Sequence, residues 1–242
     1  MTMFLMTDAV GAIDGTLVHA CIPRDKQVPY RGRGKGECFQ NVMAICDFDM
    51  IFKYVVVGWE GTAHDSRVLR ETIHDSRHNS PLPPLDKYYL VDAACTHSSG
   101  FMAPYRNARY WLNNFRSRGR ANTKEEVFNQ CYSKLRNIIE CAFGVLKACF
   151  PILKRMPSSS IDTQKRIVLA YFALHNFLRK TSFNDELFSQ YDDEEVQLEN
   201  SAQNQTPSTD NSFSASEQLF MQGLRERIAN QLFQTHNYFV VY

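Results

Sequence analysis

The sequence lacks features that mark secreted and membrane proteins. Its seven cysteines are an odd number and form no C-x-x-C pair, and Cys46, Cys131 and Cys149 stand in apolar patterns that are typical of buried thiols. A reducing compartment is therefore expected. The first residues have no basic region and are interrupted by Asp8, so no signal peptide is predicted. No apolar run is long enough to span a bilayer, and we expect a soluble protein.

Basic residues are also missing from one long stretch. Between Asp185 and Glu217 there are nine acidic residues and no Lys or Arg. The chain holds 27 basic and 26 acidic residues, so 17 acidic residues remain elsewhere against all 27 basic ones, although the net charge is only +1. A basic body suits a polyanionic partner, and the acidic stretch could cover it when no partner is bound. The same distribution could instead serve solubility alone.

The chain is long enough for one large domain with appendages, since it has 242 residues of which 44% are hydrophobic. The apolar patterns predict an α/β domain over residues 1–183. Residues 184–216 are acidic and rich in Ser, Asn and Gln, which predicts a disordered linker. A C-terminal segment over residues 217–242 follows, with a helix predicted over 217–233 that docks back on the domain.

Two predicted strands are each followed by an acid. A short buried strand over residues 9–14 ends in Asp14, with Gly15 as a turn signal, and a strand over residues 88–91 leads into Asp92. Between them the patterns predict a hairpin, with strands over 39–46 and 50–57, and then a helix that starts at Asp65. A helix between two strands normally makes a right-handed crossover that places them side by side and parallel. The two aspartates should then meet where open α/β sheets bind ligands.

A long helix is predicted over residues 124–150, because its apolar residues recur three and four positions apart. At about 100° per residue, Arg136, Glu140 and Lys147 fall together on the flank opposite the apolar face. In one interpretation, Arg136 and Glu140 form a surface ion pair at i,i+4 that contributes only a few tenths of a kcal/mol. In the other, the helix packs across the sheet edge and brings Glu140 to the two aspartates.

Three carboxylates at one point would make a metal site. They repel one another unless a cation neutralises them, and Mg²⁺ or Mn²⁺ prefers such oxygen ligands. Two such ions about 4 Å apart activate a water or a 3′-hydroxyl and stabilise the leaving oxygen of a phosphodiester. Arg136 and Lys147 would then bind phosphates beside the metals. Asp65 is open to two interpretations, a helix N-cap or a further metal ligand.

Two basic segments are candidates for contact with nucleic acid. A glycine-rich loop over residues 28–37 holds three cations at alternate positions, Arg31, Arg33 and Lys35. The segment between Asp92 and the long helix mixes arginines with aromatic residues, and it includes Arg116, Arg118 and Arg120. Cations for phosphates and rings for base stacking suit a nucleic-acid groove, although an ordinary irregular surface can have the same composition.

Other polar residues are given structural interpretations. Asp47 and Asp49, which link the two hairpin strands, are interpreted as turn formers. A second amphipathic helix is predicted over residues 162–179. Its His175 is interpreted as a packed or capping imidazole rather than as a metal ligand.

Seven segments together resemble the transposase domain of the PIF/Harbinger superfamily, which includes plant transposase-derived nucleases and their domesticated relatives. The segments are GAIDGT, NVMAICDFDM, GWEGTAHDSRVL, YYLVDA, FMAPYR, RNIIECAFGVLK and LAYFALHNFLR, and they cover most of residues 9–180. The resemblance implies a ribonuclease H-like fold, a mixed sheet flanked by helices. It also implies a catalytic triad of the DDE type, made of Asp14, Asp92 and Glu140.

The resemblance extends to the long helix, with one departure. Related DDE enzymes of the insertion-sequence type carry Tyr, Arg, Glu and Lys on this helix, and Arg136, Glu140 and Lys147 fit that spacing. Tyr132 is one residue out of register, so the role of the tyrosine is not carried over to it.

The neighbours of two triad residues also depart from the family. Ala93-Ala94-Cys95 follows Asp92 where members usually have glycine and tyrosine, and Cys141 follows Glu140 in place of arginine. Neither change removes a predicted metal ligand. The family also places a helical DNA-binding region before its first aspartate, where this chain has thirteen residues. We therefore expect a catalytic domain without its targeting module, which a separate DNA-binding protein could supply.

Two functions from different classes fit these observations. The first is a metal-dependent DNA endonuclease, a hydrolase of phosphodiester bonds with Mg²⁺ or Mn²⁺ as cofactor, located in the nucleus or also in the cytoplasm. All three expected carboxylates favour it. The second is a domesticated, non-catalytic nuclear scaffold associated with DNA or chromatin, which the altered neighbours of Asp92 and Glu140 favour. A third possibility is a gene product without function.

Overall fold

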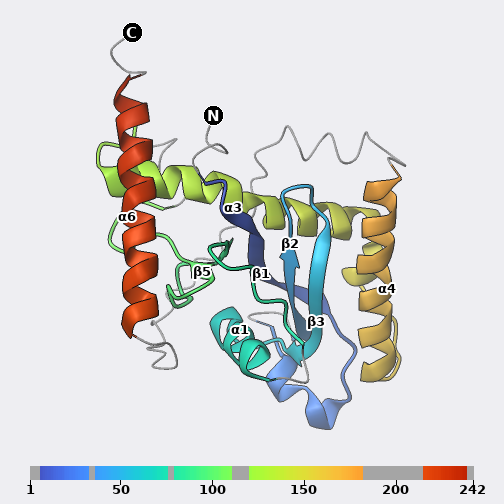
Figure 1. Ribbon diagram of the computed structural model, residues 1–242. Coiled ribbons are helices and arrows are strands. Elements are labelled where there is room, and N and C mark those ends of the chain that lie inside the picture. Colours follow the sequence, from blue (N-terminus) through green and yellow to red (C-terminus); the bar gives the residue numbers. More distant parts are fainter. Residues whose placement is uncertain (1–5, 33–35, 76–78, 111–119, 182–214, 239–242) are drawn as a thin grey trace. The chain divides into compact units, whose positions relative to one another are not determined.

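The computed structural model describes residues 6–32, 36–75, 79–110, 120–181 and 215–238. Figure 1 draws and labels its main helices and strands. In chain order these are β1 (Ala9–His19), η2 (Arg24–Lys26), η3 (Val28–Tyr30), β2 (Phe39–Cys46), β3 (Phe52–Glu60), α1 (Asp65–His74), β4 (Tyr88–Leu90), β5 (Phe101–Met102), α3 (Lys124–Cys149), η5 (Pro151–Leu153), α4 (Ile161–Lys180) and α6 (Ala215–Tyr238).

The strands form one mixed sheet in the order β3-β2-β1-β4-β5. β2 and β3 are antiparallel, whereas β4 runs parallel to both β1 and β5. The parallel pairing of β1 with β4 is the one that the crossover argument predicts. A mixed sheet with accompanying helices is an α/β architecture, and it agrees with the expected ribonuclease H-like fold.

The chain divides into two compact units, which are described separately below. The first unit comprises residues 1–12, 82–138 and 203–242, and the second comprises residues 13–81 and 139–202. Both β1 and α3 pass from one unit into the other, β1 after Ala12 and α3 after Ile138.

β1 is longer than predicted. It continues through Asp14 and Gly15 to His19, so the prediction of a turn at Gly15 and of a strand that ends at Asp14 was wrong. Sequence alone favours a turn at a glycine, but this glycine serves packing within the strand, as described below. Asp14 therefore lies inside β1, two residues beyond the last pair in its register with β4, which is Ala12↔Leu90.

The predicted hairpin is confirmed. Oδ1 of Asp47 accepts hydrogen bonds from the backbone N–H groups of Asp49, at 3.0 Å, and Ile51, at 2.9 Å, which makes Asp47 a turn former as expected. Met50 in the same turn takes a positive φ of 58°. The turn thus extends through Ile51, and β3 begins two residues later than predicted.

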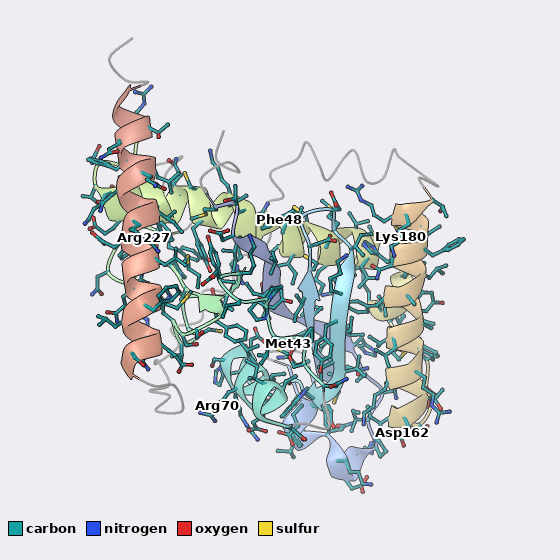
Figure 2. The ribbon with its side chains drawn as sticks, viewed as in Figure 1. Met43, Phe48, Arg70, Asp162, Lys180 and Arg227 are labelled. Carbon is teal, nitrogen blue, oxygen red and sulfur yellow. The ribbon has the colours of Figure 1, made fainter. Side chains whose placement is uncertain are left out.

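α4 packs on β3 in the second unit. The rings of Phe172 and His175 lie against the ring of Phe52, with centroids 4.6 and 4.9 Å away. The side chain of Asn176 hydrogen-bonds both the N–H and the C=O of Phe52, at 2.8 and 2.7 Å. His175 is buried, and its Nε2 lies 3.0 Å from the carbonyl oxygen of Met50. His175 is therefore a packed imidazole, as predicted, and Figure 2 marks the ends of α4 near Asp162 and Lys180.

The predicted C-terminal helix is present as α6. Its buried residues recur at helical spacing, at Met221, Ile228, Ala229 and Leu232, which gives the helix one apolar face. α6 belongs to the first unit. Residues 184–214 of the predicted acidic linker lie outside the described part of the chain.

Candidate active site

The first predicted acid, Asp14, lies in the second unit on β1. The side chain is half-buried, and its Oδ1 accepts a hydrogen bond from the N–H of Gly15 at 2.9 Å. Successive side chains of a strand point to opposite faces of the sheet. Asp14 and Thr16 therefore share one face of β1, and Gly15 faces the other side.

The face of Gly15 is occupied by Asp65. A Cβ added to Gly15 would lie 2.0 Å from Asp65 Oδ1 and 2.9 Å from Oδ2, so the carboxylate fills the space of the missing side chain. The side-chain amide of Asn41 on β2 donates to the same Oδ1 at 2.7 Å and to the carbonyl oxygen of Ala63 at 3.0 Å. Asp65 is thus fixed on the face of β1 opposite to Asp14.

Asp65 is not the N-cap of α1. The helix starts at Asp65, as predicted, but the capping position belongs to His64, which makes no side-chain cap bond. Asn41 was not identified as a partner from the sequence, because its position in an apolar strand gave no indication of what lies opposite.

Lys147 lies on the same face of β1 as Asp14. Its Nζ donates to Thr16 Oγ1 at 2.6 Å. Burial lowers the pKa of Lys147 to about 8, with the charge of Lys154 as the second cause. Glu140 precedes Lys147 by seven residues, which is about two helical turns. The two side chains therefore leave α3 on the same side, and both belong to the second unit.

The second predicted acid, Asp92, lies in the first unit, two residues after the end of β4 at Leu90. The guanidinium of Arg136 lies 3.9 Å from Asp92 Oδ1, and the N–H of Ala94 contacts Oδ2 at 3.4 Å. Arg136 is only 4% exposed, so it does not lie on the exposed flank that the surface ion-pair interpretation required. A buried arginine needs partners to offset its desolvation, and the carboxylate of Asp92 is one.

Tyr132 ties the start of the Asp92 loop to α3. Its hydroxyl lies 2.6 Å from the carbonyl oxygens of both Val91 and Met102, and it accepts the N–H of Val91 at 2.8 Å. The side chain is fully buried, and burial raises the pKa of its phenol well above the usual value. Because Tyr132 is out of register with the family signature, the sequence assigned it no role. The structure shows that it holds the residue before Asp92.

The buried face of α3 runs through these residues. Phe128, Tyr132, Ile139, Ala142, Val145 and Leu146 are fully buried, and Arg136, at 4% exposed, lies on the same face. Cys131, Leu135 and Ile138, which follow the apolar period of the helix, are only half-buried, whereas Arg136, which was predicted on the opposite flank, is buried. Hydrophobicity alone could not reveal that a tyrosine and an arginine face inward to bond the β4 loop.

The predicted DNA-contacting cations have mixed outcomes. Arg31 is exposed and forms an isolated β-bridge with Cys38, and Arg120 is also exposed. Arg33, Lys35, Arg116 and Arg118 lie outside the described residues.

Arg109 forms a two-pronged ion pair with Glu126, at 2.7 Å for both contacts, and therefore serves the structure of its loop. This ion pair, together with the N–H of Asn122, lowers the pKa of Glu126 to about 2.

Over the described segments, no three His, Cys, Asp or Glu side chains are grouped so that they could hold a metal ion. None of the helices in those segments is long and apolar enough to cross a membrane.

Comparison with known families supplies the class. Residues 13–176 match the family model described as DDE superfamily endonuclease. The matched residues make up about two thirds of the chain and include Asp14, Asp92 and Glu140, so this protein belongs to the DDE endonuclease superfamily. No match was found among curated proteins or among solved structures.

Proposed function

We propose that the protein is a metal-dependent DNA endonuclease of the DDE transposase type, from the PIF/Harbinger branch, which hydrolyses phosphodiester bonds. The observation that carries this proposal is the family match over residues 13–176, which contains Asp14, Asp92 and Glu140. Asp14 lies on β1, and Asp92 follows β4, the strand that pairs in parallel with β1. The family resemblance assigns both acids to one catalytic triad. Glu140, on the side of α3 that carries Lys147, would complete it.

The three carboxylates suit a hard divalent cation, because their donors are oxygen atoms only. We propose that Asp14, Asp92 and Glu140 hold Mg²⁺ or Mn²⁺. Bound there, two such ions would activate a water and stabilise the leaving oxygen of the scissile phosphodiester. We do not extend metal binding to Asp65, because it occupies the Gly15 face of β1.

Two cations would tune the site. Arg136, at 3.9 Å from Asp92, places a positive charge beside the carboxylate and would fix its orientation. Lys147 is bound to Thr16 on the Asp14 face and would place positive charge near the phosphate of the substrate. Exposed Arg31 and Arg120 would contact the DNA backbone, with a separate DNA-binding protein that selects the site. The proposed place of action is the nucleus, since the substrate is DNA.

The test is nicking of supercoiled plasmid by the purified chain with Mn²⁺ or Mg²⁺. Asp14→Ala should lower the rate about 100-fold or more, because loss of one metal ligand removes several kcal/mol of transition-state stabilisation. The matched control is Asp25→Ala, which removes an exposed acid of η2 and should leave the rate unchanged. Equal nicking by the Asp14 variant and the wild type, or no nicking by either, would contradict the nuclease and favour a non-catalytic scaffold.

A further inference from the structure

α6 lies outside the residues that match the family. The match ends at residue 176, whereas α6 spans Ala215–Tyr238 and belongs to the same unit as Asp92. Its apolar face is buried, with Met221 and Leu232 only 2% and 5% exposed. The helix is therefore an integral part of this unit, and its polar contacts show which residues it holds in place.

Arg225 of α6 makes several polar contacts with the segment after β5. Its Nη1 donates to the carbonyl oxygens of Ala103, at 3.0 Å, and Pro104, at 3.2 Å. The guanidinium also stacks over the ring of Tyr105, with its carbon 4.2 Å from the ring centroid. One side chain of α6 thus grips three consecutive residues that directly follow β5.

The next residue of α6, Glu226, also binds Tyr105. The hydroxyl of Tyr105 donates to Glu226 Oε2 at 2.8 Å, and Lys124 at the start of α3 pairs with the other oxygen of Glu226. Tyr105 is also held from the other side, because its N–H and C=O both bond the side chain of Asn129, each at 2.9 Å. Segment 103–105 is therefore fixed between α6 and α3.

A short series of contacts leads from segment 103–105 to Asp92. Met102, the residue before Ala103, pairs with Leu90 in the parallel register of β5 with β4. Its carbonyl oxygen accepts the N–H of Val91 at 3.1 Å, and the Tyr132 hydroxyl lies 2.6 Å from the same oxygen. Val91 is followed by Asp92. A shift of the Ala103 carbonyl would thus pass through one strand pair to the predicted catalytic acid.

The loop between Asp92 and β5 is held at the same point. His97 lies in this loop, and its Nδ1 accepts the N–H of Ala103 at 3.1 Å. Burial, followed by the positive charge of Arg225, lowers the pKa of His97 to about 4. The imidazole is therefore neutral at physiological pH and keeps an acceptor available for Ala103. Ala103 is bonded by His97 through its N–H and by Arg225 through its C=O.

We propose that α6 is a positioning element of the nuclease site and that Arg225 is its positioning residue, which sets the orientation of Asp92 through Ala103, Met102 and Val91. The catalytic consequence rests on the function proposed above, whereas the structural link does not. The competing explanation is that α6 only adds buried apolar area, in which case loss of Arg225 would weaken the unit without a particular effect near Asp92.

The test uses the full chain with Arg225→Ala, Arg225→Lys and the matched control Arg227→Ala. Arg227 is an exposed arginine on the same helix, labelled in Figure 2. Hydrogen exchange of the Val91 and Ala103 amides should be about tenfold faster in Arg225→Ala, as expected for a lost charged hydrogen bond. The Tyr88 amide, which bonds Asp8, and every amide of the Arg227 variant should exchange as in the wild type. Lysine keeps the charge but lacks the planar guanidinium that bonds Ala103 and Pro104 and stacks on Tyr105, so its variant should be intermediate.

Plasmid nicking separates this proposal from the function on which it rests. Faster exchange at Val91 together with slower nicking, and a higher Mn²⁺ concentration for half-maximal rate, is the expected result. Unchanged exchange at Val91 and Ala103, or a uniform increase throughout the unit, overturns the structural link. If exchange at Val91 changes in Arg225→Ala but this variant nicks plasmid as fast as an active wild type, the positioning role is overturned. An inactive wild type contradicts the nuclease, and the exchange data still decide the link. If Arg225→Ala does not fold, the same comparison is made with Arg225→Lys.

Discussion

The carboxylate of Asp65 occupies the place where a side chain on Gly15 would lie, since an ideal Cβ there would be 2.0 Å from Asp65 Oδ1. Asn41 holds the carboxylate in this position by a hydrogen bond of 2.7 Å. The three residues come from three separate segments of the family-like sequence. Their contact explains why a glycine directly follows the first predicted catalytic acid, in the interior of a strand where glycine has low propensity.

Gly15→Ala should destabilise the protein by about 1–3 kcal/mol, because the new methyl group displaces the Asp65 carboxylate from a packed site. The measurement is the free energy of unfolding from urea denaturation. Gly223→Ala is the matched control: a Cβ there meets nothing within 4 Å, and alanine should stabilise α6 by about 0.5–1 kcal/mol. In an Asp65→Ala background, Gly15→Ala should cost less, as a double-mutant cycle would show. Additive costs would contradict the steric explanation.

Tyr132→Phe should lower the free energy of unfolding by about 1–3 kcal/mol. The change removes the hydroxyl and leaves buried backbone groups of Val91 and Met102 with one hydrogen-bond partner fewer. The matched control is Tyr171→Phe on α4, whose ring packs on Phe150 and is half-exposed; it should stay within about 0.5 kcal/mol of the wild type. Similar values for the two variants would mean that the Tyr132 hydroxyl does not anchor the Asp92 loop.

The ion pair of Arg109 with Glu126 should make stability depend on acid pH. The pKa of Glu126 is lowered to about 2 in the folded protein, against about 4.3 for an unperturbed glutamate. A depressed folded pKa gives stability that is present above the unfolded pKa and is lost as the pH falls towards the folded value. The free energies of unfolding of the wild type and of Glu126→Gln should therefore differ at pH 6 and converge between about pH 4.5 and 2. Glu125→Gln controls for charge alone, and a pH-independent difference for Glu126→Gln would contradict the ion-pair effect.

Arg120→Ala should weaken binding to DNA of any sequence. Each phosphate contact that is lost reduces the slope of log K against log salt by about 0.9 on duplex DNA, and Arg120 is exposed. Fluorescence anisotropy with a labelled duplex at several salt concentrations gives the slope. The matched control is Arg67→Ala on α1. It also removes one exposed arginine, but that arginine is paired with Glu71 at 2.8 Å, so the salt slope should stay as in the wild type. An unchanged slope for Arg120→Ala would remove this residue from the proposed DNA surface.

Local patterns predicted the elements of the fold well. The period of the apolar residues gave α3 to within one residue at its C-terminal end, and the Asp47 turn gave the hairpin. Such signals are local, because a helix or a turn is stabilised mainly by residues a few positions apart. The continuation of β1 through Gly15 was missed, because the reason for it lies fifty residues away at Asp65.

The candidate acids were predicted from their place after apolar strands and from the family-like segments. The family match supports the class of protein, a DDE superfamily endonuclease. Their supporting residues were not found. Arg136 was placed on the outer flank of its helix, and Tyr132 was set aside because of its register. Both face inward, because the backbone around Val91 and the carboxylate of Asp92 supply the partners that a buried polar group needs.

The sequence by itself determined the DDE endonuclease superfamily, the α/β class, the hairpin and the helices, because residue types at short spacing dictate local backbone conformation. Only the tertiary structure decided that Asp65 fills the space beside Gly15, that Tyr132 and Arg136 secure the residues around position 92, and that Arg225 of α6 binds the segment after β5. These contacts join positions separated by up to about 120 residues. Steric fit and hydrogen-bond satisfaction at such separations depend on the packed fold, which no local pattern contains.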